Sequence, residues 1–255
     1  MSTALITGAS SGIGLAFAER FSADKHDLIL VARDRDRLER VAAKLSTSHG
    51  ISVEVISADL AQRDQVDLVA DRLQQSDTSV DFLVNNAGFG IREGFVDGDL
   101  AAEQQMIDVM VTATMRLSYA ALPGMVERKS GAVLNISSLA GWMTSGTYSA
   151  AKAWVTTFTE GLSHELAGTG VAATAVCPGL THTEFHSRAD MDVSQAPEWL
   201  WLDVSDVVDR ALRDSRNGKS ISVAGRQYQA LSFPIRYWRA VQRRAEGALR
   251  PRFTD

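Results

Sequence analysis

Cysteine is almost missing from this chain, which has only Cys177 among 255 residues. A single thiol excludes an intrachain disulfide and fits a reducing compartment. Basic residues do not predominate either: the net charge is −5, so no basic field suggests a nucleic-acid partner. No run approaches the roughly 18 apolar residues that a membrane-spanning helix needs. Because "TALIT" at 3–7 already has the character of a strand, no leader is expected, and we expect a cytoplasmic protein.

Proline is also scarce, with five residues, and no repeat or low-complexity linker interrupts the chain. Short apolar runs alternate with stretches of helical periodicity, a pattern that predicts one α/β domain with a doubly wound parallel sheet. The seven predicted strands are 3–7, 27–32, 51–57, 80–86, 131–137, 171–177 and 220–224. The six predicted helices lie around 14–23, 34–48, 61–75, 100–128, 148–167 and 204–216.

A glycine-rich turn, "TGASSGIG" at 7–14, joins the first predicted strand to the first predicted helix. Gly8 permits a sharp turn, Gly12 lets the backbone approach a pyrophosphate, and Gly14 allows close packing of helix on strand. Amide groups at the start of the helix would face the anion, aided by the positive end of the helix dipole. The turn therefore predicts a dinucleotide-binding site.

The end of the second predicted strand indicates which dinucleotide is bound. A site for NAD usually carries an acidic residue there, but this chain has Arg33 in "LVARDRDR". A guanidinium can form a forked pair with a 2′-phosphate, which a carboxylate would repel. We therefore expect NADP(H) in preference to NAD(H). The alternative is that Arg33 is one solvated charge in a run of Arg and Asp.

Tyr148 and Lys152 stand four residues apart in "GTYSAAKAWV" and so share one face of a predicted helix. A free phenol has a pKa of about 10 and is a poor acid–base group at neutral pH. A neighbouring ammonium stabilises phenolate, so we expect Lys152 to lower the pKa of Tyr148. The ammonium can also bond the ribose of a nicotinamide nucleotide. By itself this pair is common on helix surfaces, and its weight comes from the dinucleotide-binding sheet around it.

Ser137 and Ser138 close the strand that precedes this helix. A hydroxyl at this point could bond a substrate carbonyl and stabilise developing alkoxide charge. The alternative is a serine that satisfies loop backbone.

With these motifs in view, the chain resembles the short-chain dehydrogenases/reductases of the single-domain branch, about 250 residues long. The matching motifs are "TGASSGIG" at 7–14, "ADL" at 58–60, "NNAG" at 85–88, "NISSLAG" at 135–141, "YSAAK" at 148–152 and "PGLTHT" at 178–183. The resemblance implies a Rossmann fold with strand order 3-2-1-4-5-6-7. It implies that Ser138 orients substrate, that Tyr148 is the general acid or base, and that Lys152 is its partner. It further implies cofactor contacts at Gly8, Ser10, Ser11, Gly12, Ile13, Gly14, Arg33, Asp59, Leu60, Asn86, Ala87, Gly88, Tyr148, Lys152, Pro178, Gly179, Thr181 and Thr183.

Two features depart from the family pattern. Met110 stands where the family usually has an asparagine that helps to hold a water between the lysine and solvent. A thioether donates nothing and accepts poorly, so such a relay would need another group. In addition, Ser138 lies ten residues before Tyr148, a shorter interval than the family usually has. We expect the missing residues to be deleted from the loop "GWMTSG". Both features bear on turnover and substrate and leave the predicted fold unchanged.

The predicted catalytic domain covers 1–232 and includes a substrate lid at 184–202. Apolar side chains in the lid favour a hydrophobic carbonyl or alcohol, or else they pack the lid onto the domain. Residues 233–255 form a separate extension with six arginines and one glutamate over 236–252, the pattern of a basic amphipathic helix. That segment could contact a membrane surface, an acyl carrier or another subunit, or be a solvated surface helix. No metal is expected, since His182 and His186 have no evident third ligand.

Together these observations predict an NADP(H)-dependent oxidoreductase that interconverts a carbonyl and an alcohol on a small apolar substrate. Tyr148 would donate or accept the proton. Two alternatives stay open: a catalytically weak NADP(H)-binding sensor or scaffold, and a membrane-docked lipid or acyl reductase. We also expect a homo-oligomer and no nucleic-acid partner.

Overall fold

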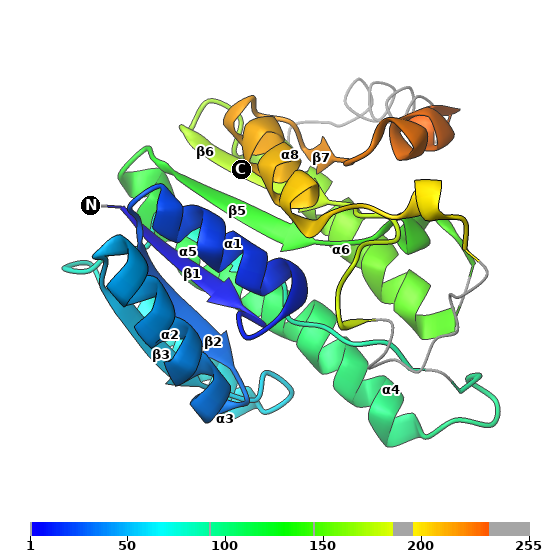
Figure 1. Ribbon diagram of the computed structural model, residues 1–255, viewed down its shortest axis with the longest axis horizontal. Helices are drawn as coiled ribbons and strands as arrows, with labels where there is room; N and C mark the ends of the chain where they lie inside the picture. The colour runs from blue at the N-terminus through cyan, green and yellow to red at the C-terminus, as the bar shows by residue number, and fades with distance from the viewer. Residues whose placement is uncertain (1, 92, 145, 186–195, 235–255) are drawn as a thin grey trace, which may run out of the picture.

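The seven strands form one parallel sheet in the order β3-β2-β1-β4-β5-β6-β7, as predicted (Figure 1). The computed structural model describes residues 2–91, 93–144, 146–185 and 196–234. The strands are β1 Thr3–Thr7, β2 Asp27–Ala32, β3 Val53–Ser57, β4 Phe82–Asn85, β5 Gly131–Ile136, β6 Val171–Val176 and β7 Ile221–Ser222. The last strand is shorter than the predicted 220–224.

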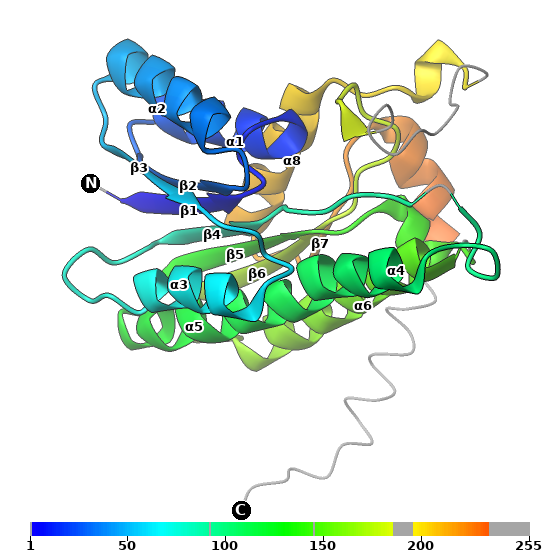
Figure 2. The same cartoon turned by 90° about the horizontal axis from the view of Figure 1, so that it is seen from below.

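Helices cover both faces of the sheet, as Figure 2 shows: α1, α2 and α8 lie on one face, and α3, α4, α5 and α6 on the other. Their bounds are α1 Gly12–Ala23, α2 Arg35–His49, α3 Arg63–Leu73, α4 Leu100–Ile107, α5 Ala113–Glu127, α6 Gly146–Glu165 and α8 Val204–Arg216. This arrangement explains why the strands are continuous apolar runs, since each side chain of a doubly covered strand meets a helix layer. In β1, for example, the four residues from Ala4 to Thr7 are all buried.

The hydrophobic core is divided by the sheet into two layers. One layer joins β-strand side chains to Phe17 and Phe21 of α1 and to Leu38 of α2. The other joins the opposite faces of the strands to Val69 of α3 and Leu117 of α5. Both layers pack against the same central strands. The carboxyl ends of β1 and β4 are therefore well packed, and the loops that follow them start from fixed positions.

The predicted helix 100–128 is interrupted, which is a difference from the expectation. Between α4 and α5, residues Asp108–Thr112 form a single π-helical segment, η1. In such a segment each backbone hydrogen bond spans five residues in place of the four of an α-helix, and these segments are frequent at functional sites. Hydrophobic periodicity does not reveal it, because η1 still buries apolar residues, Val109 and Met110, as an α-helix would. The segment lies against α6, which carries the predicted catalytic pair.

The predicted lid and tail lie partly outside the described residues. Residues 186–195 of the lid and 235–255 of the basic extension are not described. The described part of the lid segment contains the short 3-10 helix η3, Glu198–Leu200, and a helix over 226–234 follows β7. Among the helices that the structure describes, none has the length and apolar content to cross a membrane.

Candidate functional site

The glycine turn adopts the backbone conformation that its sequence predicts. Gly8 and Gly12 have φ of +64° and +53°, values in the left-handed region that favours glycine. The turn is tied to the end of β4 by two side chains. Asn86 Nδ2 donates to the carbonyls of Thr7 at 2.9 Å and Gly8 at 3.2 Å, and the Thr7 hydroxyl accepts from the amides of Asn86 and Ala87 at 2.9 and 3.0 Å. Thr7, which sequence reasoning did not single out, therefore couples the turn to the "NNAG" segment.

Gly14 has a different task from the other two glycines. A Cβ atom at this position would lie 2.3 Å from the Gly8 carbonyl oxygen and 2.5 Å from Asn86 Nδ2. Only a residue without a side chain lets α1 begin this close to the turn. Gly14 does not line the pocket described below, so its place among the predicted cofactor contacts is indirect.

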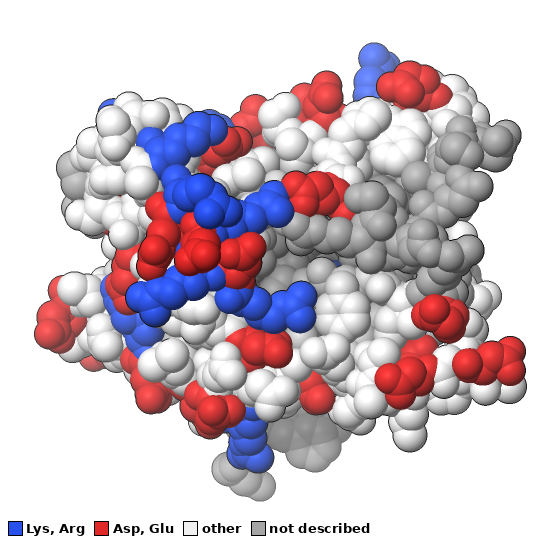
Figure 3. All heavy atoms as spheres, turned by 60° about the horizontal axis from the view of Figure 1, so that its bottom comes forward, with Lys and Arg blue, Asp and Glu red and all other residues white. Residues whose placement is uncertain are grey.

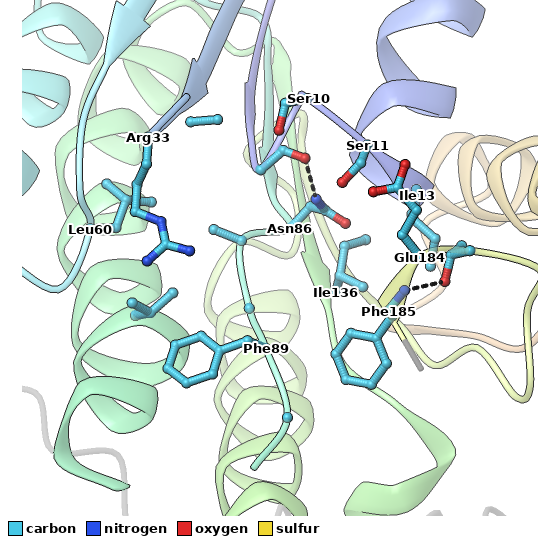
Figure 4. A pocket seen from close by; sticks show the side chains of 18 of the residues that line it. Ser10, Ser11, Ile13, Arg33, Leu60, Asn86, Phe89, Ile136, Glu184 and Phe185 are labelled. Carbon is cyan, nitrogen blue, oxygen red and sulfur yellow. Dashed lines mark hydrogen bonds between the residues drawn. The ribbon is translucent and has the colours of Figure 1, made fainter. Parts of the chain in front are cut away.

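Charged side chains border the end of the pocket nearest to β2 and β3. Figure 4 places Arg33, at the end of β2, across the pocket from Ser10 and Ser11 of the glycine turn. Arg37, on the first turn of α2, lines the same end, and its amide donates to the Asp34 side chain that caps the helix. Figure 3 shows basic and acidic side chains interspersed over this half of the molecule. Arg33 and Arg37 can therefore bind an anionic ligand, while the acidic residues around them keep the local electrostatic potential from being strongly positive.

Asp59 and Leu60 also line this end, directly after β3. The Asp59 amide donates to Gln65 Oε1 at 2.6 Å, and its carboxylate accepts from the Ala61 amide at 3.1 Å. These bonds fix the loop between β3 and α3. Asp59 therefore has a structural task in shaping the pocket wall beside any contact with a ligand.

At the other end of the pocket, Ser138, Tyr148 and Lys152 come together. The Ser138 hydroxyl is near enough to the Tyr148 hydroxyl to lower the pKa of the phenol, and it accepts from the Ala140 amide at 3.1 Å. Lys152 Nζ lies 5.7 Å from the centre of the Tyr148 ring. The three residues come from the end of β5 and one face of α6, so a shortened interval between Ser138 and Tyr148 does not separate them.

Lys152 is buried, with a relative exposure of 5%. Its ammonium donates to the Ile136 carbonyl at 2.8 Å, and burial lowers its pKa to about 8. Gly88 shows what else is nearby: a Cβ there would lie 3.1 Å from Met110 Cε and 3.7 Å from Lys152 Nζ. Met110 therefore occupies the space next to the lysine with an apolar methyl group, in agreement with its burial in η1.

The expected lowering of the Tyr148 pKa is not found in the protein by itself. Burial raises the pKa of Tyr148 to about 12, and its bond with Ser138 offsets only part of that increase. The prediction assumed that the charge of the adjacent ammonium would dominate. Burial, however, raises the pKa of Tyr148 and also lowers the pKa of Lys152, because it disfavours the charged form of both groups. Tyr148 is thus a protonated phenol at neutral pH, a state suited to donating a proton.

The "PGLTHT" segment forms the third wall of the pocket, where Pro178, Gly179, Thr181 and Thr183 all line it. Its shape depends on Tyr228 from the helix over 226–234. The Tyr228 hydroxyl accepts from the Leu180 amide at 3.1 Å and donates to the Leu200 carbonyl at 2.8 Å. A Cβ on Gly179 would lie 2.2 Å from the Tyr228 ring, so this glycine is required by close packing.

These walls enclose one pocket of about 700 Å³ at the carboxyl ends of the strands. Every predicted catalytic residue lines it, and so does every predicted cofactor residue except Gly14. The pocket also has lining residues that were not among the predicted catalytic or cofactor residues. Ser137, the alternative to Ser138 in the sequence analysis, is one of them, and Glu184 and Phe185 from the predicted lid are two more. The others are Val31, Ala32, Asp34, Arg37, Ala58, Phe89, Gly90, Gln105, Val109 and Ile136. A signal for Arg37 was present, since it stands four residues after Arg33 and three after the helix cap.

The pocket fits an extended dinucleotide. The positive-φ glycines at one end leave room for a pyrophosphate against the backbone, and the Ser138–Tyr148–Lys152 cluster stands at the other end. Within the described residues, no group of three metal-ligating side chains occurs. His182 instead stacks on Trp201 with ring centres 4.8 Å apart, while His186 lies outside the described residues.

Comparisons with known proteins agree with this geometry. The family model described as short chain dehydrogenase matches residues 2–193. An uncharacterized oxidoreductase of Staphylococcus saprophyticus is 34% identical over 212 residues, which cover 82% of this chain and 88% of the relative.

Two solved structures are similar over the whole chain. A short-chain dehydrogenase from Sphingobium yanoikuyae in complex with NADPH has a TM-score of 0.85 and 33% identity, covering 100% of this chain and 98% of its own. The bulky-bulky ketone specific alcohol dehydrogenase from Comamonas testosteroni has a TM-score of 0.82 and 30% identity, covering 100% and 97%. With its sheet order, glycine turn and Ser–Tyr–Lys cluster, the chain belongs to the short-chain dehydrogenase family of oxidoreductases.

Proposed function

We propose that the protein is an NADP(H)-dependent oxidoreductase that interconverts a carbonyl and an alcohol on an apolar substrate. One observation carries the proposal: Ser138, Tyr148 and Lys152 line the same pocket as the glycine turn. A reacting group bound beside Tyr148 is therefore within the same cavity as the dinucleotide-binding backbone. The family's oxidoreductase chemistry supports the same reaction class.

The preference for NADP(H) rests on charge. Arg33 and Arg37 both line the end of the pocket that follows β2. Two guanidinium groups favour a ligand with an additional phosphate, because each can form charge-assisted hydrogen bonds with phosphate oxygens. The Sphingobium yanoikuyae neighbour, which is in complex with NADPH, supports this preference. The glycine-turn amides would hold the pyrophosphate, and Lys152 would hold the ribose next to the nicotinamide.

In this proposal the protein's residues position the substrate and move its proton, while the bound nicotinamide supplies or accepts the hydride. The Ser138 hydroxyl binds the substrate oxygen, and Tyr148 donates its proton to that oxygen during reduction. A pKa of about 12 keeps Tyr148 protonated until the oxygen gains negative charge. The Lys152 ammonium, close to the tyrosine ring, then stabilises the resulting phenolate.

An apolar substrate is favoured by the side chains near the catalytic end. The Phe185 ring centre lies 5.8 Å from that of Tyr148, and Phe89 lines the same pocket on the side of Arg33 (Figure 4). A phenyl ring next to the catalytic tyrosine and a second one in the pocket wall suit a hydrophobic ketone or alcohol better than a charged one. The ketone specificity named for the Comamonas testosteroni neighbour supports this class of substrate.

Replacing Tyr148 with Phe tests the proposal. The change should reduce turnover of apolar ketones by about 1,000-fold, because it removes the proton donor and keeps the ring. The dissociation constant for NADPH should stay within about twofold. Turnover is followed by NADPH absorbance and binding by calorimetry. Tyr119→Phe is the matched control, since Tyr119 is 79% exposed on α5, and this variant should turn over like the wild type.

The same measurements distinguish an enzyme from a catalytically weak NADP(H)-binding sensor. NADPH binding by the wild-type protein without oxidation across a panel of apolar ketones would support a binding protein. Unchanged turnover in Tyr148→Phe would refute the role given to the phenol. The apolar methyl of Met110 beside Lys152 is the structural feature that keeps the sensor hypothesis in view.

A further inference from the structure

An ion pair closes one side of the pocket between two segments that are far apart in sequence. Arg37, on the first turn of α2, donates from Nη1 to Glu184 Oε2 at 3.2 Å and from Nη2 to Glu184 Oε1 at 2.6 Å. Both side chains line the pocket. Their side chains are 31% and 48% exposed, so the pair lies at the mouth of the pocket and is open to exchange with a ligand.

Glu184 stands between two residues that touch other parts of the same pocket. Thr183 lies over the glycine turn, since a Cβ on Gly12 would be 3.4 Å from the Thr183 side chain. Phe185 lies 5.8 Å from the Tyr148 ring, and its amide donates to the Thr183 hydroxyl at 3.3 Å. Three consecutive residues thus contact the glycine turn, the start of α2 and the predicted catalytic tyrosine in turn.

The bond from Arg37 uses both Nη atoms of the guanidinium, the edge that a phosphate would also take. A phosphate ester bound between Arg33 and Arg37 would meet the Glu184 carboxylate as a competitor for the same donors. Asp34, whose side chain accepts from the Arg37 amide, adds a second negative charge but bonds the backbone and not the guanidinium. Competition for the guanidinium therefore comes from Glu184.

We propose that the Arg37–Glu184 ion pair is a strap that the 2′-phosphate of NADP(H) must open, so that Glu184 restrains the preference for phosphate-bearing nucleotides. The inference rests on the proposed use of NADP(H). A nucleotide without that phosphate leaves the strap closed and gains nothing from Arg37. A nucleotide with it takes Arg37 and breaks the bonds between Arg37 and Glu184.

Binding of two nucleotide fragments tests the strap without any turnover. Adenosine 2′,5′-bisphosphate carries the competing phosphate, and adenosine 5′-monophosphate does not. Glu184→Gln should bind the bisphosphate about three- to fivefold more tightly than the wild type, the effect of removing one partly exposed ion-pair partner. Its affinity for the monophosphate should change less than about twofold. Calorimetry on the full-length protein measures each dissociation constant.

Arg37→Gln and the double variant complete the cycle. Arg37→Gln should weaken the bisphosphate about tenfold, because a charged donor to phosphate is lost. In the Arg37→Gln background, Glu184→Gln should have no further effect beyond about 1.5-fold, since the carboxylate then has no guanidinium to withhold. Glu39→Gln is the matched control: it removes one carboxylate from an ion pair on α2 that involves Arg35 and not Arg37. It should leave the ratio of the two affinities unchanged.

Each result decides between the strap and a general charge effect. Equal tightening of both fragments by Glu184→Gln, or the same tightening by Glu39→Gln, would overturn the inference. So would an unchanged affinity for the bisphosphate in Glu184→Gln. A wild-type protein that binds the bisphosphate no better than the monophosphate, with no change in any variant, would overturn the preference for NADP(H) and the strap with it. NADPH preference without a Glu184 effect would overturn the strap alone.

Discussion

The two ends of the pocket are built in different ways. The glycine-turn end uses backbone and exposed cations: Gly8 and Gly12 at positive φ, with Arg33 and Arg37 at the mouth. The catalytic end uses burial: Lys152 is 5% exposed, and its pKa and that of Tyr148 are shifted mainly by desolvation. Changes at the first end should act through local geometry or screened charge, and changes at the second through the low-dielectric surroundings.

The sharpest way to break the turn end is Gly14→Ala. The added Cβ would lie 2.3 Å from the Gly8 carbonyl oxygen, which is backbone and cannot move away alone. The variant should lose about 3 kcal/mol of unfolding free energy, the upper range for overpacking a tight site, and its NADPH affinity should fall. Chemical denaturation followed by circular dichroism measures the stability.

Gly161→Ala is the matched control for this change. Gly161 lies in α6 with no heavy atom within 4 Å of the place where its Cβ would be. Its replacement by alanine should leave stability unchanged or raise it by up to about 1 kcal/mol, because alanine favours the helix. A Gly14→Ala protein as stable as the Gly161→Ala protein would contradict the role given to close packing at the turn.

The contrast between the two ends also explains how far the sequence could predict the fold. Apolar runs, their spacing and the glycine turn are local patterns, so they predicted the alternation of strands and helices, whereas the sheet order was implied by the family resemblance and is confirmed. The π-helical segment Asp108–Thr112 was missed because its buried face looks helical in sequence. β7 was predicted too long, since Val223 and Ala224 are buried without joining the ladder.

At the site, sequence could place residues but not their electrostatics. Most of the predicted residues share one pocket because they follow the carboxyl ends of parallel strands, and α6 adds Tyr148 and Lys152 at the same edge. The pKa of Tyr148 was expected in the wrong direction, because its main cause is burial, which depends on packing by other elements that sequence does not show. The contact between Glu184 and Arg37 was missed because the two residues are 147 positions apart in the sequence. The homo-oligomer and the contacts of 233–252 stay predictions.

The catalytic end can be tested through stability alone, by comparing the wild type with Lys152→Met. The pKa of Lys152 is about 8 in the folded protein and 10.5 for an unperturbed lysine, so between these values the unfolded chain binds more protons. Stability from this group therefore rises with pH across that window. The difference in unfolding free energy between the wild type and Lys152→Met should therefore shift by about 2 kcal/mol in favour of the wild type from pH 8 to pH 10.

Lys44→Met provides the control for removing a lysine. Lys44 is 71% exposed and pairs with Glu19 on the surface. Its variant should keep the pH dependence of the wild type over the same range. Identical slopes for the wild type and Lys152→Met would show that Lys152 is not held in a desolvated state.

The smallest expected effect is at the exposed end of the pocket, where Arg33→Gln should weaken NADPH about tenfold and NADH less than about twofold. The reason is that glutamine keeps length and polarity but loses the charge that favours a 2′-phosphate. Arg35→Gln is the control: Arg35 is 68% exposed, pairs with Glu39 and does not line the pocket. Because an exposed charge is screened by salt, the loss of NADPH affinity in Arg33→Gln should shrink between roughly 0.05 and 0.5 M salt. The pH dependence of the unfolding free energy that comes from buried Lys152 should not change over the same salt range. An Arg33 effect that is equal for both nucleotides would mean that the mouth of the pocket binds the part they share, and the contrast between its two ends would then lie in burial alone.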